Sequence, residues 1–296
     1  LMRGAFMNTK NSVLVKWQME PGSGGLPRIV YDQEGIFAEI YLNGAHLTRF
    51  ENKARGLSMF WMDPAPMVAG RAIKGGVPLV FPWFGPLKDK PDFPRHGFAR
   101  NITWSVAEEY SRGNESGIAL EAKDSDLTRV VWPHSFRARL EIGVSETGVT
   151  MRFMIENTDK TQFTFENALH AYFAVGRVAD ISVRGLDATE YIDKMDGFAQ
   201  KRLSGDVRFP GPTDSVFLDT ATPCLIREPG RATIRIVKSG SRETVVWNPG
   251  AKKSDPGDVA PPFVCVEPAN CMAHPVTLMP GEKHSMEASF SWEAGQ

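Results

Sequence analysis

The sequence has no long apolar run and no surplus of charge of either sign. No segment reaches the roughly 18 apolar residues that cross a bilayer, and the first residues lack the apolar core of a secretion signal. With 34 basic and 35 acidic residues, the formal net charge is -1, which argues against a broad surface for nucleic acid or membrane. We therefore expect a soluble, cytoplasmic, monomeric protein with no nucleic-acid and no membrane partner.

Cysteine is scarce as well. Cys224, Cys265 and Cys271 are an odd number without C-x-x-C spacing, which argues against a disulfide framework and predicts buried free thiols. The sequence also lacks an H-E-x-x-H metal motif, a G-x-S-x-G nucleophile elbow, a Walker A loop and a G-x-G-x-x-G loop. These absences predict a protein that uses neither a metal nor a cofactor.

Period-two alternation is the dominant pattern that is present. In residues 136–144, 149–157, 231–238 and 284–294, apolar side chains alternate with polar ones, which is typical of antiparallel strands with one buried face. The 27 glycines and 21 prolines supply frequent turn formers between such segments. We find no long segment with a helical period. The pattern predicts an all-β fold, a large antiparallel β-sandwich.

No linker clearly divides the chain. We therefore expect residues 1–296 to form a single domain, with residues 1–11 as a disordered or artificial tail. Two segments, 82–94 and 248–262, read as long irregular loops. Loops of this length in a compact domain are usually functional or disordered.

The first of these loops lies in the segment GGVPLVFPWFGPLKDKPDFPRHGFAR, residues 75–100. It begins as an apolar run, carries five prolines and ends in a basic cluster around His96. Prolines suit a loop that holds its shape without a hydrogen-bond ladder, and a cluster of cations can hold a phosphate. The cations are Arg95 and Arg100 within the segment, and Arg71 and Lys74 just upstream of it. Trp83, Phe84 and Phe93 are candidates either for an aromatic wall beside a sugar or for the core.

Two titratable residues stand in apolar surroundings. His170 lies within the strand-like segment 162–175, and Glu267 follows four apolar residues and precedes a proline, which reads as the end of a buried strand. A buried histidine or carboxylate must be hydrogen-bonded, ion-paired or used in proton transfer. The sequence alone leaves these alternatives open. We expect the other histidines outside the basic cluster to be structural or exposed: His46, His134, His274 and His284.

Several blocks occur in an order that identifies a family. They are KGGVPLVFPWFGP, RHGFARN, ENALHAYFAVG, ISVRGLDATEYIDK, TDSVFLD, VVWNPG and FVCVEPAN. Together they resemble the hexose-6-phosphate mutarotase branch of the aldose 1-epimerase family, from about Ile29 to about Trp292. The resemblance implies a galactose-mutarotase-like β-sandwich that interconverts the α and β anomers of D-glucose 6-phosphate and related hexose 6-phosphates by acid/base ring opening.

The resemblance also implies residue roles. The histidine of ALH, His170, corresponds to the general acid that protonates the ring oxygen, and the glutamate of CVE, Glu267, to the general base at the anomeric hydroxyl. His96 would hydrogen-bond the sugar near the ring oxygen or the anomeric oxygen. Asp214 would hold sugar hydroxyls, and Arg100 would contact the phosphate or the sugar.

The chain departs from the family pattern at two cationic positions. Lys74 stands where the family commonly has arginine, and Arg95 stands where it often has glutamine or alanine. Lysine keeps the charge but loses the forked donor geometry of arginine, so Arg95 is a candidate to supply that geometry to the phosphate.

Three alternatives remain open. A mutarotase for neutral aldoses would not need the basic residues. A non-catalytic sugar-phosphate-binding protein on the same fold would not need both His170 and Glu267. A domain that acts on polysaccharides would need an open groove with exposed aromatic residues.

Overall fold

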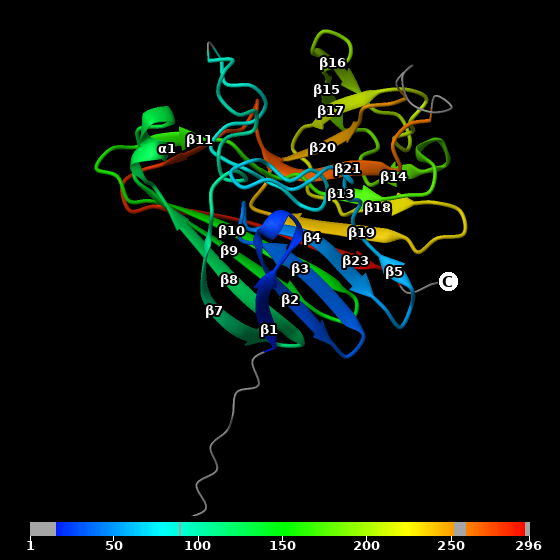
Figure 1. Cartoon of the computed structure of the whole chain (residues 1–296). Coiled ribbons are helices and arrows are strands. Elements are labelled where there is room, and N and C mark those ends of the chain that lie inside the picture. The colour runs from blue at the N-terminus through cyan, green and yellow to red at the C-terminus, as the bar shows by residue number, and fades with distance from the viewer. Residues whose placement is uncertain (1–15, 89, 252–258, 294–296) are drawn as a thin grey trace, which may run out of the picture.

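The computed structural model describes residues 16–88, 90–251 and 259–293. The tail predicted at residues 1–11 and the middle of the loop predicted at residues 248–262 lie outside these ranges. The described residues are almost entirely strand and loop, as the all-β prediction requires (Figure 1). None of their helices is long and apolar enough to cross a membrane.

Strands form three main sheets, and the pairing between named strands is antiparallel throughout. The N-terminal sheet contains, in spatial order, β1 (Trp17–Pro21), β2 (Pro27–Gln33), β3 (Ile36–Tyr41), β4 (His46–Asn52) and β5 (Leu57–Ser58). The long sheet contains β14 (Ser182–Arg184), β18 (Cys224–Arg227), β19 (Ile234–Ser239), β23 (Lys283–Trp292), β10 (Gly148–Asn157), β9 (Phe136–Val144), β8 (Glu115–Lys123) and β7 (Ser105–Arg112).

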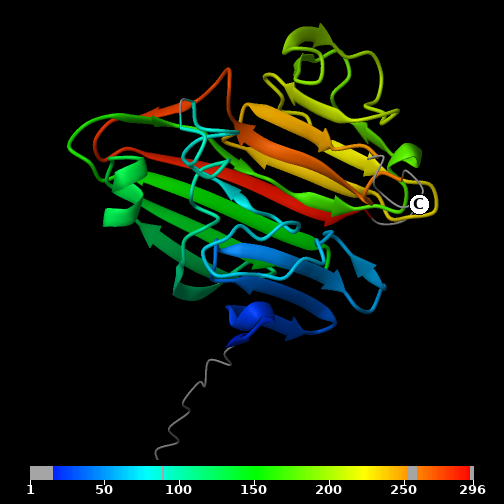
Figure 2. The same cartoon turned by 45° about the horizontal axis from the view of Figure 1, so that its top comes forward.

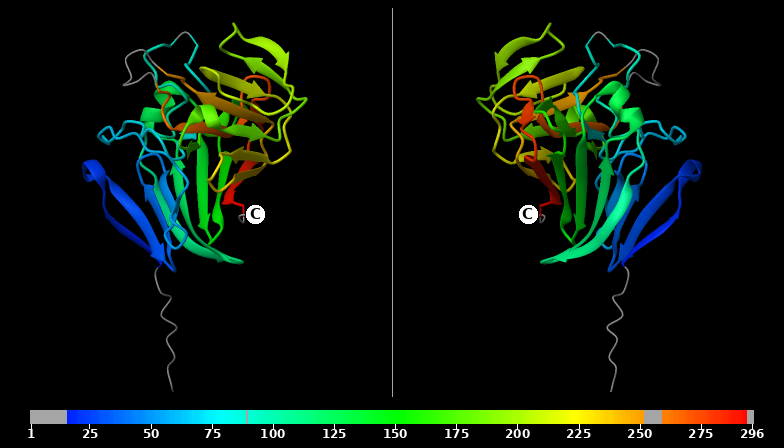
Figure 3. Two further views of the ribbon diagram at one scale, coloured as in Figure 1. Left: turned by 90° about the vertical axis from the view of Figure 1, so that its right-hand side faces the viewer. Right: turned by 90° about the vertical axis from the view of Figure 1, so that its left-hand side faces the viewer.

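The third sheet is named the β21 sheet after its central strand. It contains, in spatial order, β16 (Ala199–Arg202), β15 (Glu190–Asp193), β17 (Thr213–Phe217), β20 (Glu243–Asn248), β21 (Phe263–Asn270), β12 (Asn167–Leu169) and β6 (Leu79–Val80), and β13 (Tyr172–Ala174) also pairs with β21. A small separate pair joins β11 (Phe163–Phe165) to β22 (Val276–Leu278). Figure 3 shows the β15–β16 hairpin at the end of the molecule away from the β1–β2 hairpin.

Helices are few and short among the described residues. The α-helix α1 (Asp126–Val131) begins at Ser125, where the Ser125 and Thr128 side chains form a reciprocal capping box. Two single 3₁₀ turns, η1 (Ser23–Gly25) and η2 (Val178–Asp180), complete the set. A helix of six residues is too short to leave a helical period in the sequence.

The core lies on one face of the long sheet. On β9, Phe136, Leu140 and Ile142 are at most 1% exposed, whereas Arg139 on the opposite face forms ion pairs with neighbouring glutamates. The N-terminal sheet and the β21 sheet both pack against the buried face (Figures 1 and 2). Ring contacts mark the two junctions: Phe50 with Trp292 at 5.3 Å and Phe173 with Phe290 at 5.3 Å between centroids. This arrangement is the predicted sandwich.

The strand β21 is buried on both faces. Val264 and Val266 point into the main core. The alternate side chains Cys265 and Glu267 therefore point to the other face of the sheet. Glu267 lies in the middle of β21, not at its end, because the strand continues through Asn270. This corrects the prediction of a carboxylate at a strand end.

The segment 75–100 begins in the sandwich and returns to it. Its apolar part forms β6, and the buried Phe81 forms a bridge to Gly97. Gly97 has φ of +73°, and a Cβ at this position would lie 1.9 Å from the Phe81 carbonyl oxygen, so only glycine fits this close approach. The loop between them thus returns beside its own start, with His96 held at φ of 63°.

Candidate active site

A cavity of about 430 Å³ opens at the β21 sheet, within the usual size range for a small-molecule site. All the residues that were singled out as catalytic or substrate-binding line it, although they come from distant parts of the sequence. They are Lys74, Arg95, His96, Arg100, His170, Asp214 and Glu267. Arg71, the further candidate for phosphate contact, is exposed and does not line the cavity.

The register of β21 explains why His170 and Glu267 meet. The strand β12 pairs Ala168 with Ala269, and β13 pairs Tyr172 with Cys265. The same register, continued across the gap between β12 and β13, sets His170 opposite Glu267. In this gap the backbone N–H of His170 donates to the Pro78 carbonyl at 3.0 Å instead of joining the ladder with β21.

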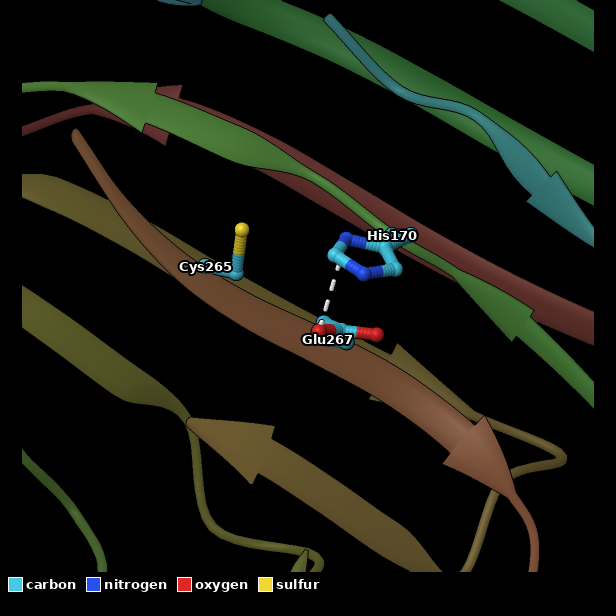
Figure 4. A group of neighbouring side chains, drawn as sticks. All are labelled: His170, Cys265 and Glu267. Atoms are coloured by element: carbon cyan, nitrogen blue, oxygen red, sulfur yellow. Dashed lines mark ion pairs between the residues drawn. The ribbon is translucent and has the colours of Figure 1, made fainter. Parts of the chain in front are cut away.

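His170 and Glu267 both line the cavity. Figure 4 shows their side chains facing each other. His170 Nδ1 lies 3.4 Å from Glu267 Oε1, and the two side chains are 8% and 1% exposed. The contact does not have hydrogen-bond geometry, and neither His170 Nδ1 nor Glu267 Oε2 has a hydrogen-bond partner among the described residues. Unpartnered buried polar atoms are rare and costly, so both atoms are candidates to contact a ligand.

Burial shifts the pKa of both groups toward their neutral forms. It raises the pKa of Glu267 well above its usual range, with a further contribution from Asp214. It lowers the pKa of His170 to about 3, and the positive charge of Arg100 acts in the same direction. A protonated Glu267 beside a neutral His170 carries the same number of protons as a carboxylate beside an imidazolium. The pair can therefore pass between these two states by exchanging protons with a bound molecule.

His96 is held in one tautomer. The Gly85 N–H donates to His96 Nδ1 at 3.2 Å, so Nδ1 carries no proton and Nε2 is the donor nitrogen of the neutral ring. Burial, with the charge of His170 next in size, lowers the pKa of His96 to about 2. Its ring lies 5.4 Å from that of His170, nearly perpendicular at 84°. His96 can thus offer a hydrogen bond to a sugar oxygen beside His170.

The predicted cations differ in how they are held. Arg100 donates to the Arg95 carbonyl at 2.8 Å, and its buried Nε has no partner among the described residues. Lys74 Nζ lies 2.7 Å from Asp63 Oδ2, and this hydrogen bond lowers the pKa of Asp63. No carboxylate in the described part of the chain pairs with Arg95 or Arg100. These two guanidinium groups are therefore the better placed to receive an anion.

Sequence reasoning missed Lys194. This residue follows β15, and its Nζ lies 2.8 Å from Asp214 Oδ1. The two residues line the cavity together. A signal was present, because Lys194 closes the block ISVRGLDATEYIDK that carries part of the family resemblance.

Sequence reasoning also missed two aromatic residues that surround His170. Tyr172 stacks on the His170 ring at 4.9 Å with an angle of 12°, and Trp247 lies edge-on at 5.8 Å. Of the three aromatic residues considered for a wall, Phe84 lines the cavity. Trp83 is in the core and donates from Nε1 to the Pro94 carbonyl, and Phe93 packs against the core.

The remaining histidines and the cysteines have the predicted environments. His46 is buried and bonds the Gly75 carbonyl through Nε2 at 2.8 Å. His134 contacts Asp159, His274 contacts Glu243, and His284 contacts Asn270. The thiols of Cys224, Cys265 and Cys271 are free and buried.

Comparisons with known proteins show the family of this chain. The family described as aldose 1-epimerase matches residues 27–291. A Salmonella typhimurium protein named "Putative glucose-6-phosphate 1-epimerase" is 33% identical over 249 residues, which cover 82% of each chain. A protein of the same name from Escherichia coli is 33% identical over 253 residues, which cover 82% of this chain and 83% of that one.

Solved structures show the same fold. A crystal structure of a protein from Salmonella typhimurium, titled "putative mutarotase", has a TM-score of 0.77 at 30% identity and covers 90% of this chain and 91% of that one. A galactose 1-epimerase from Lactobacillus acidophilus has a TM-score of 0.71 at 14% identity and covers 95% and 98%. The fold is therefore of the galactose-mutarotase type, and the chain belongs to the aldose 1-epimerase family.

Proposed function

We propose that this protein interconverts the α and β anomers of D-glucose 6-phosphate and related hexose 6-phosphates. The observation that carries the proposal is the juxtaposition of His170 Nδ1 and Glu267 Oε1, 3.4 Å apart. Both residues line a cavity that also contains two cations without a carboxylate partner among the described residues. The first feature suits proton exchange with an anomeric centre, and the second suits a phosphate.

The pair needs no nucleophile for this reaction. Glu267 as carboxylate takes the proton of the C1 hydroxyl while His170 as imidazolium protonates the ring oxygen, and the C1–O5 bond breaks. The products are an open-chain aldehyde, a protonated Glu267 and a neutral His170. After rotation about the C1–C2 bond, the hydroxyl on C5 attacks the other face of C1, and both protons return.

Burial favours the neutral pair, which is the state that accompanies the aldehyde. A closed sugar whose anomeric hydroxyl donates to Glu267 favours the carboxylate, because hydrogen bonds to a charged form stabilise it. A bound phosphate dianion favours the imidazolium by its charge. Substrate binding and proton transfer are in this way linked through the same two groups.

The other lining residues hold the sugar. His96 Nε2–H donates to an oxygen near the anomeric centre, and Asp214, oriented by Lys194, accepts from hydroxyl groups. The phosphate contacts Arg95 and Arg100, with Lys74 as a further cation of the cavity. In this assignment, Arg95 supplies the forked donors that lysine lacks at position 74.

A second candidate, a mutarotase for neutral aldoses, has one observation in its favour. Two of the four lining cations, Lys74 and Lys194, are already paired with Asp63 and Asp214. If none of the four cations contacted a phosphate, a neutral aldose would fit the cavity as well as a hexose 6-phosphate.

Anomer exchange separates the two candidates. Nearly pure α-glucose 6-phosphate is converted to the β anomer and followed with a β-selective dehydrogenase, and α-glucose is followed in parallel. We expect strong acceleration with the phosphate and little with glucose. Equal acceleration with both would favour the neutral-aldose mutarotase, and no acceleration with either would leave a sugar-phosphate-binding protein.

A further inference from the structure

Cys265 lies beside the proposed catalytic pair without a role in the proposed reaction. It is on β21 two residues before Glu267, so the two side chains point to the same face of the sheet. Figure 4 shows its thiol beside His170 and Glu267, all three on one side of the β21 ribbon. One ligand-type atom from each of the three residues lies within 4.8 Å of the others.

The three side chains offer the donor atoms of a zinc site. Nitrogen, sulfur and carboxylate oxygen bind Zn²⁺ at about 2.0 to 2.3 Å, and sites with three protein ligands leave a fourth position open. Tetrahedral coordination at those lengths places neighbouring ligand atoms about 3.3 to 3.8 Å apart. The separation of 3.4 Å between His170 Nδ1 and Glu267 Oε1 already falls in that range. The widest pair of the three has to close by about 1 Å.

Unpartnered atoms supply an independent indication of a ligand. His170 Nδ1 and Glu267 Oε2 are buried and have no hydrogen-bond partner in the ranges that the structure describes. The two residues are 6% and 1% exposed. A cation bound to the imidazole nitrogen and the carboxylate would give both groups a partner. Buried polar groups without a partner destabilise the protein.

We propose that His170, Cys265 and Glu267 form a site for Zn²⁺ that competes with the sugar. Zn²⁺ binds the Cys265 thiolate and the Glu267 carboxylate, so the protons of the thiol and of the protonated Glu267 pass to solvent. The fourth coordination position faces the cavity and holds water. The metal occupies both proposed catalytic groups and therefore stops proton transfer. The inhibition rests on the proposed function, whereas the binding of metal does not.

Nearby charges limit the affinity. Arg100 and Lys194 line the same cavity and repel a cation. The site also offers only three protein ligands, one nitrogen, one sulfur and one oxygen, unlike the closed four-ligand sites that hold structural zinc. We therefore expect reversible binding that a chelator removes.

Co²⁺ provides the direct test, because thiolate coordination gives it a charge-transfer absorption band. The protein is titrated with Co²⁺, and Zn²⁺ is then added to displace it. Cys265→Ser removes the soft ligand, and Cys224→Ser is the matched control, a buried free thiol on β18 outside the cluster. We expect a saturable band in the wild type and in Cys224→Ser. In Cys265→Ser the band is lost and the Zn²⁺ affinity falls at least about 10-fold to 100-fold, the loss typical of a single outer-shell partner.

Cys265→Ala serves where Cys265→Ser does not fold. No saturable band in the wild type, or a band of equal strength in the Cys265 variants, would overturn the proposed site.

Activity provides the second arm. Anomerisation is followed by polarimetry, which keeps any effect of Zn²⁺ on a coupling enzyme out of the measurement. We expect Zn²⁺ to inhibit the wild type reversibly, Mg²⁺ at equal concentration to have no effect because it prefers oxygen ligands, and Cys265→Ser to keep its basal rate and resist Zn²⁺. A protein that binds Co²⁺ through Cys265 but accelerates no anomerisation would retain the metal site and lose the proposed function. An active protein that Zn²⁺ inhibits equally in the wild type and in Cys265→Ser would retain the proposed function and lose the metal site.

Discussion

His170 lies directly beside Glu267 of β21, with 3.4 Å between Nδ1 and Oε1, although the two residues are far apart in the sequence. The short strands β12 and β13 share one register with β21 and leave His170 in the gap between them. The flanking strands thus fix the position of His170 along β21, while its own backbone N–H donates to the Pro78 carbonyl. This geometry makes the two side chains a unit.

Because the two residues exchange protons as a pair, we expect the losses of kcat in their single variants not to multiply in the double variant. His170→Gln and Glu267→Gln are each expected to lower kcat for anomerisation about 10²-fold to 10⁴-fold, the usual contribution of a general acid or base. The double variant should lose little more than either single one, because one missing partner already stops the exchange. Glu109→Gln, on the exposed strand β7, is the control and should keep the wild-type rate. Losses that multiply in the double variant would show that the two residues act independently.

The phosphate assignment predicts a selective effect on KM. Arg95→Gln is expected to raise KM for glucose 6-phosphate about 10-fold, which corresponds to the loss of one charge-assisted hydrogen bond, with little change for glucose. Arg71→Gln is the matched control, since Arg71 is an exposed arginine near Lys74 that does not line the cavity. Steady-state kinetics with both sugars measure the effect. An equal loss for glucose, or an equal loss in Arg71→Gln, would contradict a phosphate contact at Arg95.

His46 predicts acid sensitivity of the fold. Burial lowers its pKa to about 4 from the ordinary value of 6.5, so between these values the unfolded chain binds a proton that the folded protein does not. The stability that depends on neutral His46 is complete above pH 6.5 and is lost as the pH falls toward 4. Between pH 7 and pH 5, urea titrations should show a loss of unfolding free energy that is about 2 kcal/mol smaller in His46→Gln than in the wild type. Equal losses in the two proteins would contradict this, and between pH 7 and pH 8 their slopes should agree.

The close approach of Gly97 to the Phe81 carbonyl predicts that alanine at position 97 destabilises the loop that holds His96. Gly97→Ala and Gly85→Ala both place alanine at positive φ, but only the new Cβ at Gly97 meets an atom, the Phe81 carbonyl oxygen at 1.9 Å, whereas that at Gly85 meets nothing within 4 Å. We expect Gly85→Ala to cost about 1 to 2 kcal/mol of unfolding free energy and Gly97→Ala about 3 kcal/mol or more. Thermal unfolding compares them. Similar melting temperatures would show that the loop relaxes and does not hold His96 rigidly.

The sequence predicted the strands well because one face of each is buried. The alternation over residues 136–144 coincides with β9, and that over residues 284–294 differs from β23 by two residues or fewer at either end. Period two reports burial on one side and is visible in a single sequence. A strand buried on both faces lacks this signal, which is why β21 was read as ending at Glu267.

The residues of the candidate site were predicted from the family blocks, but the distances and contacts between them were not. The contact of His170 with Glu267 depends on a register between distant segments, and no local pattern specifies such a register. Lys194 follows a partly exposed strand, and only the fold shows that it pairs with Asp214. Trp83 and Phe84 are neighbours of similar character, and only the fold shows that the first enters the core and the second lines the cavity.

The central claim is that Glu267, facing His170, exchanges protons with the anomeric centre of a hexose 6-phosphate. The most direct measurement is exchange NMR on the anomeric protons of glucose 6-phosphate at equilibrium, with the wild type and with Glu267→Gln. We predict an exchange rate that rises in proportion to the concentration of the wild type and stays at the buffer rate with folded Glu267→Gln. A wild-type rate equal to that of buffer, or equal rates for the two proteins, would contradict the account.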